Sequence, residues 1–527
     1  MAKILIVTGI LAEPIIRQVI SKVKTTHKVD ILVTPVSVAA FLTTRYIADY
    51  LRKLGVKASD YDYVLIPGLA MGSAKVIEDA IGVRALKGTV NAYDLTDILS
   101  MDSLDSLSPD VPADEILRDY REKAAERILL EIENKLNDEN SLSINGLRVP
   151  LTPPPIRVAA EVTEAHELSV DQVIRRAEYY IDSGADIVVL GFEALNPHPD
   201  KVGELVRKVR EWRDDVPLAV DSEIPSEIEA AVNSGADAII NINLNNMDRI
   251  NIDRDVAIVI IPEIPGARMI PQDPKARVEL LVKAVDKARS RGFRRVMADA
   301  ILDPFGSTFN SLMAYYEFKR VMPNVPMFMG IGNVTELIDA DSIGVNASMV
   351  MLAQEIGVSV VFVVEKSQKA QGSVLETKVA AQMAALASYK RSPPKDLGIS
   401  LLVLKDKRRV GSKVHERYND VIYASSEKRN FRLDPLGFFR IWVDHENKCI
   451  EAMYIGKKGR ILIRGRSARE IRYEIASRDL VSEISHALYL GEELAKAEMA
   501  LLLNKSYVQE MPLFKLPRYI DIRGDER

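Results

Sequence analysis

Between two proline-rich segments, the sequence contains eight short runs of apolar, largely β-branched residues, separated by amphipathic helical stretches. The segments are Pro150-Leu-Thr-Pro-Pro-Pro155 and Arg391-Ser-Pro-Pro-Lys395. The runs lie at 156–160, 187–190, 217–220, 238–242, 256–261, 295–298, 325–329 and 358–364. Strands that alternate with helices over about 235 residues are typical of a (β/α)8 TIM barrel. An open doubly wound sheet is the alternative, but no G-x-G-x-x-G motif opens the region, which favours the barrel.

Local motifs support a repeated strand-and-helix unit. Ser183-Gly-Ala-Asp186 recurs as Ser234-Gly-Ala-Asp237, and each glycine is expected to end a helix before the next strand. Ser169-Val-Asp-Gln172 and Ser226-Glu-Ile-Glu229 both have the spacing of a capping box at a helix start. We therefore expect one structural unit to recur around the barrel.

The regions on either side predict two further domains. An N-terminal flavodoxin-like α/β domain is indicated by alternating strand and helix patterns at 3–8, 13–23, 29–34, 41–54 and 63–66, before a charged helix at 114–137. A C-terminal α+β domain is indicated by strand patterns and helical spacing at 399–404, 438–443, 450–454, 460–464 and 468–503. The expected domains are therefore 1–149, 150–392 (the barrel) and 393–527.

Charge and composition exclude several classes of protein. The 527 residues include 70 Lys+Arg and 75 Asp+Glu, a formal net charge of −5, so no basic excess is present to bind nucleic acid. The single cysteine, Cys449, excludes an intrachain disulfide or a thiolate zinc site. Because no run of about 18 apolar residues predicts a membrane span, we expect a soluble, cytoplasmic protein without a membrane partner.

Polar residues follow nearly every predicted strand of the barrel. Strand ends of such a barrel meet at one rim, where ligands bind. Carboxylates and amides predominate in this set: Glu161, Glu193, Asp221, Asn241, Asn243, Glu263, Asp299 and Asn333. An ionised carboxylate accepts two parallel hydrogen bonds from a guanidine-like edge, so the set favours a heterocycle with several N–H donors. Ordinary solvated loop ends are the alternative for any single residue.

Cationic and hydroxyl side chains gather after the eighth strand, at Lys366, Ser367, Lys369 and Ser373, just before a helix. Loops at this position often hold phosphate, so we expect a phosphate or diphosphate site there, with a solvated basic loop as the alternative. The histidines show neither H-x₃-H nor H-E-x-x-H spacing, so no protein metal site is expected. His166 and His198 fall on rim loops, so either could contact a substrate, but a surface position is favoured for each.

Several of these motifs resemble the pterin-binding barrel family, which includes dihydropteroate synthase and corrinoid-linked methyltransferases. Glu161-Val-Thr163 is similar to an Asn-Val-Thr strand end of the synthases, and the stretch at 184–193 is similar to their Gly-Ala-Asp-Ile-Ile-Asp-Ile-Gly-Gly-Glu. Ala219-Val-Asp-Ser222 and Met297-Ala-Asp299 resemble the two motifs with a pterin-binding Asp. Gly235-Ala-Asp-Ala-Ile-Ile-Asn241 is similar to Gly-Ala-Asp-Ile-Ile-Asn. The whole architecture resembles the archaeal dihydropteroate synthase-related proteins.

The resemblance implies a transferase that condenses a dihydropterin-methyl diphosphate with an arylamine, in folate or tetrahydromethanopterin-type cofactor biosynthesis. A ribosylaminobenzene phosphate is one candidate amine. Asp221, Asp299 and Lys366 are the implied catalytic residues, and Mg²⁺ is the candidate cofactor. The implied substrate-binding residues are Glu161, Thr163, Glu193, Asn241, Asn243, Glu263, Arg268, Asn333, Ser367, Lys369 and Ser373. We expect small-molecule pterin and arylamine substrates and a homodimer.

Two alternatives stay open, because the chain has Leu195-Asn196 and Gly332-Asn333 where the synthases have Thr-Arg and Ser-Arg. Gly330-Ile-Gly-Asn-Val334 resembles the strand-seven turn of the corrinoid-linked methyltransferases, which favours methyl transfer with Asn333 polarising a pterin ring nitrogen. The other alternative is a non-catalytic pterin-binding protein or carrier.

Overall fold

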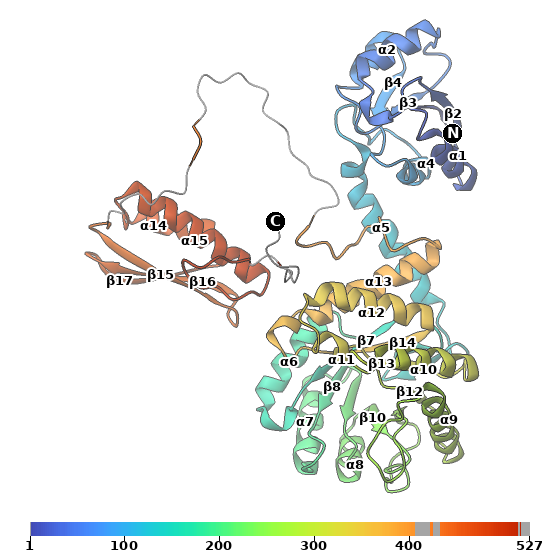
Figure 1. Cartoon of the computed structure of the whole chain (residues 1–527), viewed down its shortest axis with the longest axis vertical. Helices are drawn as coiled ribbons and strands as arrows, with labels where there is room; N and C mark the ends of the chain where they lie inside the picture. Colours follow the sequence, from blue (N-terminus) through green and yellow to red (C-terminus); the bar gives the residue numbers. More distant parts are fainter. Residues whose placement is uncertain (1, 406–421, 425–432, 515–516, 518–527) are drawn as a thin grey trace, which may run out of the picture. The chain divides into compact units, whose positions relative to one another are not determined.

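The computed structural model describes residues 2–405, 422–424, 433–514 and 517, and the chain divides into two compact units, 1–407 and 408–527 (Figure 1). The first unit contains an N-terminal sheet and the barrel, and the second contains a small antiparallel sheet with two helices. The division into three domains stays a prediction. Among the described residues, no helix combines the length and apolar character that a membrane crossing requires.

The first unit begins with a parallel sheet in the order β2-β1-β3-β4. Its strands are β1 (Lys3–Thr8), β2 (Lys28–Val33), β3 (Tyr63–Ile66) and β4 (Arg84–Lys87). The accompanying helices are α1 (Glu13–Lys22), α2 (Thr44–Lys53), α3 (Lys75–Ile81) and α4 (Leu95–Leu99). The three predicted strands are confirmed, and β4 was missed because it is a short run with charged ends. The predicted charged helix is α5 (Ala113–Asn134).

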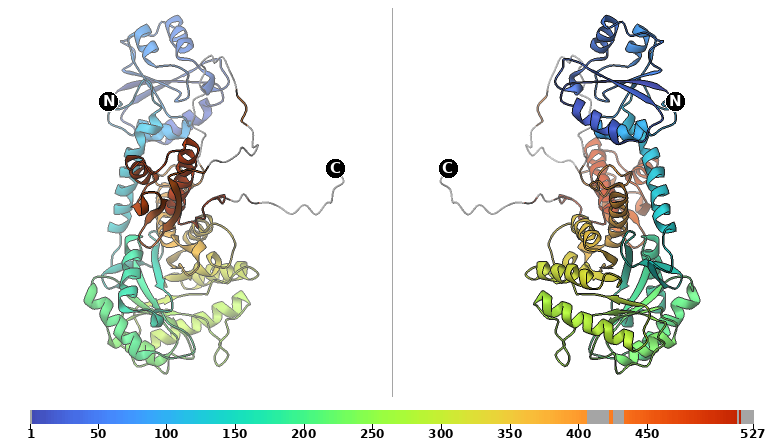
Figure 2. Two further views of the ribbon diagram at one scale, coloured as in Figure 1. Left: turned by 90° about the vertical axis from the view of Figure 1, so that its left-hand side faces the viewer. Right: turned by 90° about the vertical axis from the view of Figure 1, so that its right-hand side faces the viewer.

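Eight parallel strands form a closed barrel, which confirms the predicted fold and excludes the open sheet. The strands are β7 (Arg157–Val162), β8 (Ile187–Gly191), β9 (Leu218–Asp221), β10 (Ala238–Ile242), β11 (Ala257–Ile260), β12 (Val296–Ala298), β13 (Met327–Gly330) and β14 (Val358–Val364). The helices are α6 (Val170–Asp182), α7 (Pro199–Trp212), α8 (Pro225–Asn233), α9 (Pro274–Ser290), α10 (Thr308–Val321), α11 (Gly332–Thr335), α12 (Ser342–Ile356) and α13 (Ser373–Lys390). Most of them surround the strands (Figures 1 and 2). The barrel closes where β14 pairs with β7, from Val360 opposite Arg157 to Val364 opposite Glu161.

A hairpin closes the amino end of the barrel. Its strands are β5 (Ser141–Ile144) and β6 (Leu147–Pro150). Ile144 and Val149 are fully buried and join the cluster of barrel-interior side chains that includes Val189 and Phe328. The turn is anchored because Asn145 donates a hydrogen bond to the carbonyl of residue 214 (2.7 Å), just before β9. The side chains of the hairpin therefore fill the amino end of the barrel interior. This agrees with the general rule that such a barrel encloses packed side chains and no open channel.

The repeated Ser-Gly-Ala-Asp motif positions the starts of two strands. Gly184 and Gly235 have φ angles of 95° and 104°, so helices α6 and α8 end there as predicted. Asp186 accepts a hydrogen bond from a main-chain N–H near the start of β7 (2.8 Å), and Asp237 accepts one from the start of β9 (2.9 Å). Each aspartate therefore ties its own strand to the preceding neighbour in the barrel.

The two predicted capping boxes have different outcomes. The box at Ser169 is confirmed, with the reciprocal hydrogen bonds to and from Gln172. The box at Ser226 is wrong, because α8 begins at Pro225 and no side chain caps it. Glu227 is fully buried there and accepts a hydrogen bond from Ser222 instead (2.5 Å).

The second unit is an antiparallel sheet with two helices on one face (Figure 1). Its elements are β15 (Gly437–Asp444), β16 (Cys449–Gly456), β17 (Gly459–Gly465), α14 (Ala468–Ser477) and α15 (Ile484–Leu502). The predicted strands at 438–443, 450–454 and 460–464 are confirmed. The strand expected at 399–404, in the first unit, is wrong, because Leu402, Val403 and Leu404 are exposed and pair with no strand of the described residues.

Replacing the hairpin residue Ile144 with alanine (Ile144→Ala) is expected to destabilise the barrel by about 2–5 kcal/mol, because the substitution leaves a cavity beneath a closed interior. Urea denaturation followed by circular dichroism measures the change. Leu375→Ala, at an exposed position of α13, is the control and should change the unfolding free energy by less than about 1 kcal/mol. An equal effect of both substitutions would show that the hairpin does not seal the interior.

Candidate functional site

Three acidic side chains from different strands meet at the carboxyl end of the barrel. Glu161 lies near the end of β7, Asp221 ends β9, and Asp299 follows β12. Burial raises the pKa of Glu161 to about 8, that of Asp221 to about 6 and that of Asp299 to about 7. The charge of Asp221 also raises the pKa of both other carboxyl groups, so the three titrate as an interacting set.

An irregularity in β10 brings an amide onto this set. Asn241 donates a hydrogen bond from Nδ2 to Oδ1 of Asp221 (2.5 Å). Its φ of 71° lies in the left-handed region, which asparagine adopts more readily than most residues, and the register of β10 against β11 shifts between Ile239 and Ile242. The structure therefore brings together Asp221 and Asn241, which the sequence placed in the same site.

One carboxylate oxygen of Asp299 accepts two hydrogen bonds from the protein. Tyr315 of α10 donates its hydroxyl hydrogen to Oδ1, and the N–H of Ile301 donates to the same oxygen (2.7 Å). Burial and the charge of Asp299 raise the pKa of Tyr315 well above its usual value, so the phenol stays a donor. The described residues donate no hydrogen bond to Oδ2, so that oxygen has no protein donor in this part of the chain.

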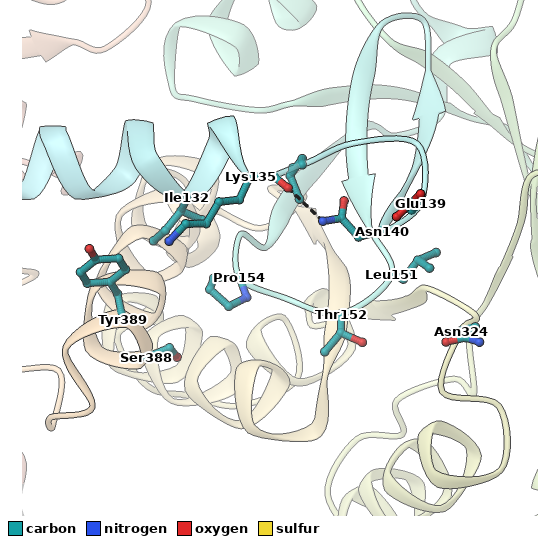
Figure 3. A pocket seen from close by; sticks show the side chains of 11 residues that line it. Ile132, Lys135, Glu139, Asn140, Leu151, Thr152, Pro154, Asn324, Ser388 and Tyr389 are labelled. Carbon is teal, nitrogen blue, oxygen red and sulfur yellow. Dashed lines mark hydrogen bonds between the residues drawn. The ribbon is translucent and has the colours of Figure 1, made fainter.

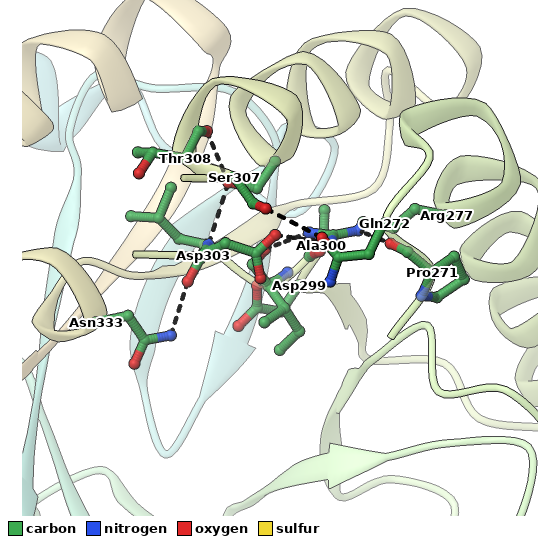
Figure 4. Close-up of polar contacts among 12 residues, drawn as sticks. Pro271, Gln272, Arg277, Asp299, Ala300, Asp303, Ser307, Thr308 and Asn333 are labelled. Atoms are coloured by element: carbon green, nitrogen blue, oxygen red, sulfur yellow. Dashed lines mark hydrogen bonds and ion pairs between the residues drawn. The ribbon is translucent and has the colours of Figure 1, made fainter. Parts of the chain in front are cut away.

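Arg277 of α9 fixes the loop that follows Asp299 (Figure 4). Its guanidinium is fully buried, donates to two main-chain carbonyls of this loop (2.8 and 3.2 Å) and pairs with Asp303 (2.8 Å). The amide of Asn333 donates to the carbonyl of Leu302 (2.8 Å). Because a buried cation is tolerated only when its donors are paired, these contacts determine the shape of the loop.

Three other predicted substrate-binding residues contact the protein itself. The Oδ1 of buried Asn243 accepts a hydrogen bond from the N–H of Asn245 (2.8 Å). Glu263, also buried, accepts one from the side-chain amide of Asn245 (2.8 Å). Arg268 is exposed and lies 3.4 Å from Glu223. The structure therefore places Asn243 and Glu263 in the framework of a rim loop and Arg268 on the surface.

The loop after β14, where a phosphate or diphosphate site was predicted, carries an acidic side chain at the start of α13. The carboxylate of Glu365 accepts the N–H of Val374 there (2.9 Å), so this N–H is already paired within the protein. Lys369 donates to the carbonyl of Thr335 (2.8 Å) and to a second carbonyl nearby. The phosphate site stays a prediction, and the motif did not show that an acidic side chain of the same loop pairs with the helix start.

The loop after β14 also contains one exposed lysine and two buried serine hydroxyl groups. Lys366 is exposed and pairs with Glu164 (2.8 Å), an ion pair that a phosphate could displace at small cost. The hydroxyl oxygens of Ser367 and Ser373 are buried and have no hydrogen-bond partner among the described residues. Lys366 is therefore the cation of this loop that remains accessible to a ligand.

Glu193 belongs to a cluster that the sequence did not predict. Its Oε1 lies 2.8 Å from Nε2 of His198 and 3.6 Å from Nε2 of His166. The two imidazole rings stack, with centroids 4.6 Å apart. The surface position expected for His166 is wrong, because its side chain is only 10% exposed. Thr163 begins the rim loop that contains His166.

A separate cavity of about 570 Å³ lies at the opposite end of the barrel, between the end of α5, the segment before β7 and the end of α13 (Figure 3). Lys135, Asn140, Thr152 and Tyr389 are among its lining residues. The side chains at the ends of the barrel strands do not reach this cavity, so it is not part of the candidate site.

Comparison with known proteins assigns the family. The profile of the family described as "Pterin binding enzyme" matches residues 161–364, and that of "PterinBD-DUF4346" matches residues 433–510. An uncharacterized protein of Methanocaldococcus jannaschii is 36% identical over 528 residues, which cover 97% of this chain and 99% of that protein. This chain belongs to the pterin-binding enzyme family. The first match runs from Glu161, near the end of β7, to the end of β14, and so covers seven barrel strands in full and the last two residues of β7.

Solved structures similar to this pterin-binding family member include two dihydropteroate synthases. The Xanthomonas albilineans enzyme in complex with 7,8-dihydropteroate is 19% identical, with a TM-score of 0.38, over 48% of this chain and 100% of that one. The Yersinia pestis enzyme is 15% identical, with a TM-score of 0.38, over 47% of this chain and 99% of that one.

Sequence reasoning missed the residues that act on the rim from the helices. The pattern of the helix that contains Tyr315 indicates only which of its residues are buried. No sequence motif links Tyr315 to Asp299. Arg277 was detectable in principle, because it is a charged residue between the apolar positions of α9. The spacing of the histidines along the chain predicted no metal site in this family member. Such spacing does not detect contacts between side chains of two different loops.

Replacement of Asp299 with asparagine (Asp299→Asn) is expected to stabilise the protein more at pH 8 than at pH 5. A carboxyl group whose pKa is raised on folding contributes stability that is complete below its unfolded pKa, near 3.8, and is lost as the pH rises through about 7. Asparagine does not titrate, so the gain over wild type should grow by about 2 kcal/mol between these pH values.

Urea denaturation at both pH values measures this gain. Asp286→Asn, at an exposed position of α9, is the matched control and should show no such growth. The same gain for Asp299→Asn at pH 5 and pH 8 would contradict a raised pKa at this position.

Proposed function

We propose that the barrel rim condenses a dihydropterin-methyl diphosphate with an arylamine and releases diphosphate, in folate or tetrahydromethanopterin-type cofactor biosynthesis. A ribosylaminobenzene phosphate is one candidate for the amine. The observation that supports this proposal is the meeting of Asp221, Asn241 and Asp299 at one rim, in a chain of the pterin-binding enzyme family.

The rim acids suit the donor edge of a pterin. The 2-amino group and the adjacent ring N–H of a pterin point in the same direction, and an ionised carboxylate accepts both hydrogen bonds. Asp299 has one oxygen to which no described residue donates, and Asn241 beside Asp221 supplies both an amide donor and an acceptor. Because an unpaired buried charge is costly, these carboxylates gain more from a ligand with N–H donors than exposed ones would.

The proposed reaction forms a bond between the amine nitrogen and the pterin methylene carbon, while the bond from that carbon to the diphosphate oxygen breaks. The amine then loses one proton, which the diphosphate or a rim carboxylate accepts. Negative charge grows on the leaving diphosphate, and Lys366 is the accessible cation of the β14 loop that would stabilise it. The hydroxyl groups of Ser367 and Ser373 have no partner among the described residues and are further donors of that loop.

Mg²⁺ fits the acidic side of this rim. Hard divalent cations prefer carboxylate oxygens, and the Glu161 carboxylate is buried beside Asp221. Glu161 and Asp221 would hold the ion, which when bound would neutralise charge on the diphosphate. A nearby cation would also remove the mutual repulsion that raises the pKa of Glu161.

The enzyme is expected to release diphosphate from dihydropterin-methyl diphosphate only when an arylamine is present. Asp221→Asn should lower kcat/KM by about 10–100-fold, because it removes a charged hydrogen-bond acceptor from the pterin site. A coupled diphosphate assay with p-aminobenzoate and with ribosylaminobenzene phosphate measures both effects, and Asp286→Asn is the control. Tight pterin binding without diphosphate release under every condition would favour the non-catalytic binder.

Pterin binding at pH 7 is expected to release a fraction of one proton. Burial holds the rim acids partly protonated near neutral pH, and a ligand that donates N–H bonds stabilises their ionised forms. Calorimetric titrations in two buffers with different ionisation enthalpies measure the number of protons released. Asp299→Asn should reduce this number, and an unchanged value would show that Asp299 does not face the ligand.

A further inference from the structure

We propose that His166, Glu193 and His198 form a binding site for one divalent transition-metal ion, with Zn²⁺ as the first candidate. The site is distinct from the Mg²⁺ proposed above, and it does not depend on the proposed condensation. His166 lies in the loop after β7, Glu193 follows β8, and His198 immediately precedes α7. One ligand atom from each residue lies within 4.8 Å of the other two.

The present partners of His166 do not account for its position. Its side chain is 10% exposed, and its Nδ1 is buried without a hydrogen-bond partner. Its Nε2 lies 3.6 Å from Oε1 of Glu193, which is longer than a hydrogen bond. A buried imidazole without a hydrogen bond is unfavourable. An ion placed between Nε2 and Oε1 would give Nε2 a partner, whereas Nδ1 would stay without one among the described residues.

The surrounding residues orient the other two ligands. Asn196 donates a hydrogen bond to Oε2 of Glu193 (3.1 Å), which leaves Oε1 directed at the imidazoles. The main-chain N–H of His198 donates to Glu227 (2.6 Å), which is fully buried and bonded to Ser222. Such supporting contacts are typical of metal sites, where they hold the ligands in position.

The donor set selects the class of ion. Two imidazoles and one carboxylate bind Zn²⁺ or Fe²⁺, whereas Mg²⁺ and Ca²⁺ prefer oxygen ligands throughout. Three protein ligands leave a position of a four-coordinate ion for water or a substrate atom, as catalytic and not structural zinc sites do.

The site adjoins the rim acids. Gly191 pairs with Asp221 in the sheet, and the next residue, Phe192, donates its N–H to the carbonyl of Asp221 (3.2 Å). The Glu161 carboxylate lies directly over Gly191, where the Cβ of any other residue would be 1.8 Å from Oε1. An ion at Glu193 would therefore act as a Lewis acid beside the carboxylates that we assign to the pterin.

Metal binding is measured on the full chain in a Cys449→Ser background, because Asp444, Cys449 and Glu451 are the other described group with ligand atoms close together. Chelator-treated protein is titrated with Zn²⁺ by calorimetry and with Co²⁺ by visible absorption. We expect one equivalent of either ion. His166→Ala and His198→Ala should each weaken binding by more than about 100-fold, since loss of a supporting contact alone costs about 10–100-fold. His445→Ala, in the second unit, is the matched control and should bind as the parent does.

A rescue variant separates loss of a ligand from loss of folding. His198→Cys keeps a zinc ligand and should retain binding, with a new sulfur-to-cobalt band in the near ultraviolet that the parent lacks. The proposal is overturned if the parent takes up neither ion, if the double variant His166→Ala/His198→Ala binds as tightly as the parent, or if His198→Cys binds Co²⁺ without the sulfur band.

Discussion

The parallel pairing of β14 with β7 is the contact on which the rest of the barrel depends. It closes the sheet, so that Val364 lies opposite Glu161 although about 200 residues separate them. In an open sheet β7 would be an edge strand, and Glu161 would be solvated like any surface carboxylate. Closure instead directs the ends of β7, β9 and β12 toward one another across the mouth, and their acidic groups interact there. The electrostatics of the site therefore follow from the topology of the fold.

Closure of the barrel also explains how the rim can contain three carboxyl groups that would destabilise the fold if all were ionised. Three carboxylates in one desolvated region repel each other, and the fold tolerates them because protons remain bound near neutral pH. Burial is what keeps Asp299 protonated, because the hydrogen bond from Tyr315 and the charge of Arg277 both lower its pKa. No described residue donates to the other oxygen of Asp299, so the burial that costs stability also leaves an acceptor for a ligand.

The sequence predicted the barrel and much of its rim for a physical reason. Buried parallel strands must be apolar, and their carboxyl ends all reach solvent at the same end of the barrel. A polar residue that follows an apolar run could therefore be assigned to the rim without knowledge of any contact. Asp221, Asn241 and Asp299 were found in this way. The helix cap by Glu365, the burial of His166 and the hydroxyl of Tyr315 depend on which side chains face each other across loops distant in sequence. No period or motif encodes those orientations, so these contacts could not be predicted from the sequence.

The β5–β6 hairpin fills the amino end of the barrel, so any ligand at the rim has a single route to solvent. If the rim binds the two reactants of the proposed condensation, they share one opening and cannot enter and leave independently. The reactant that sits deeper, against the strand ends, would then bind first and leave last. A seal at the far end of the barrel would thus impose an order of binding at the mouth, although none of its side chains touches the acids there.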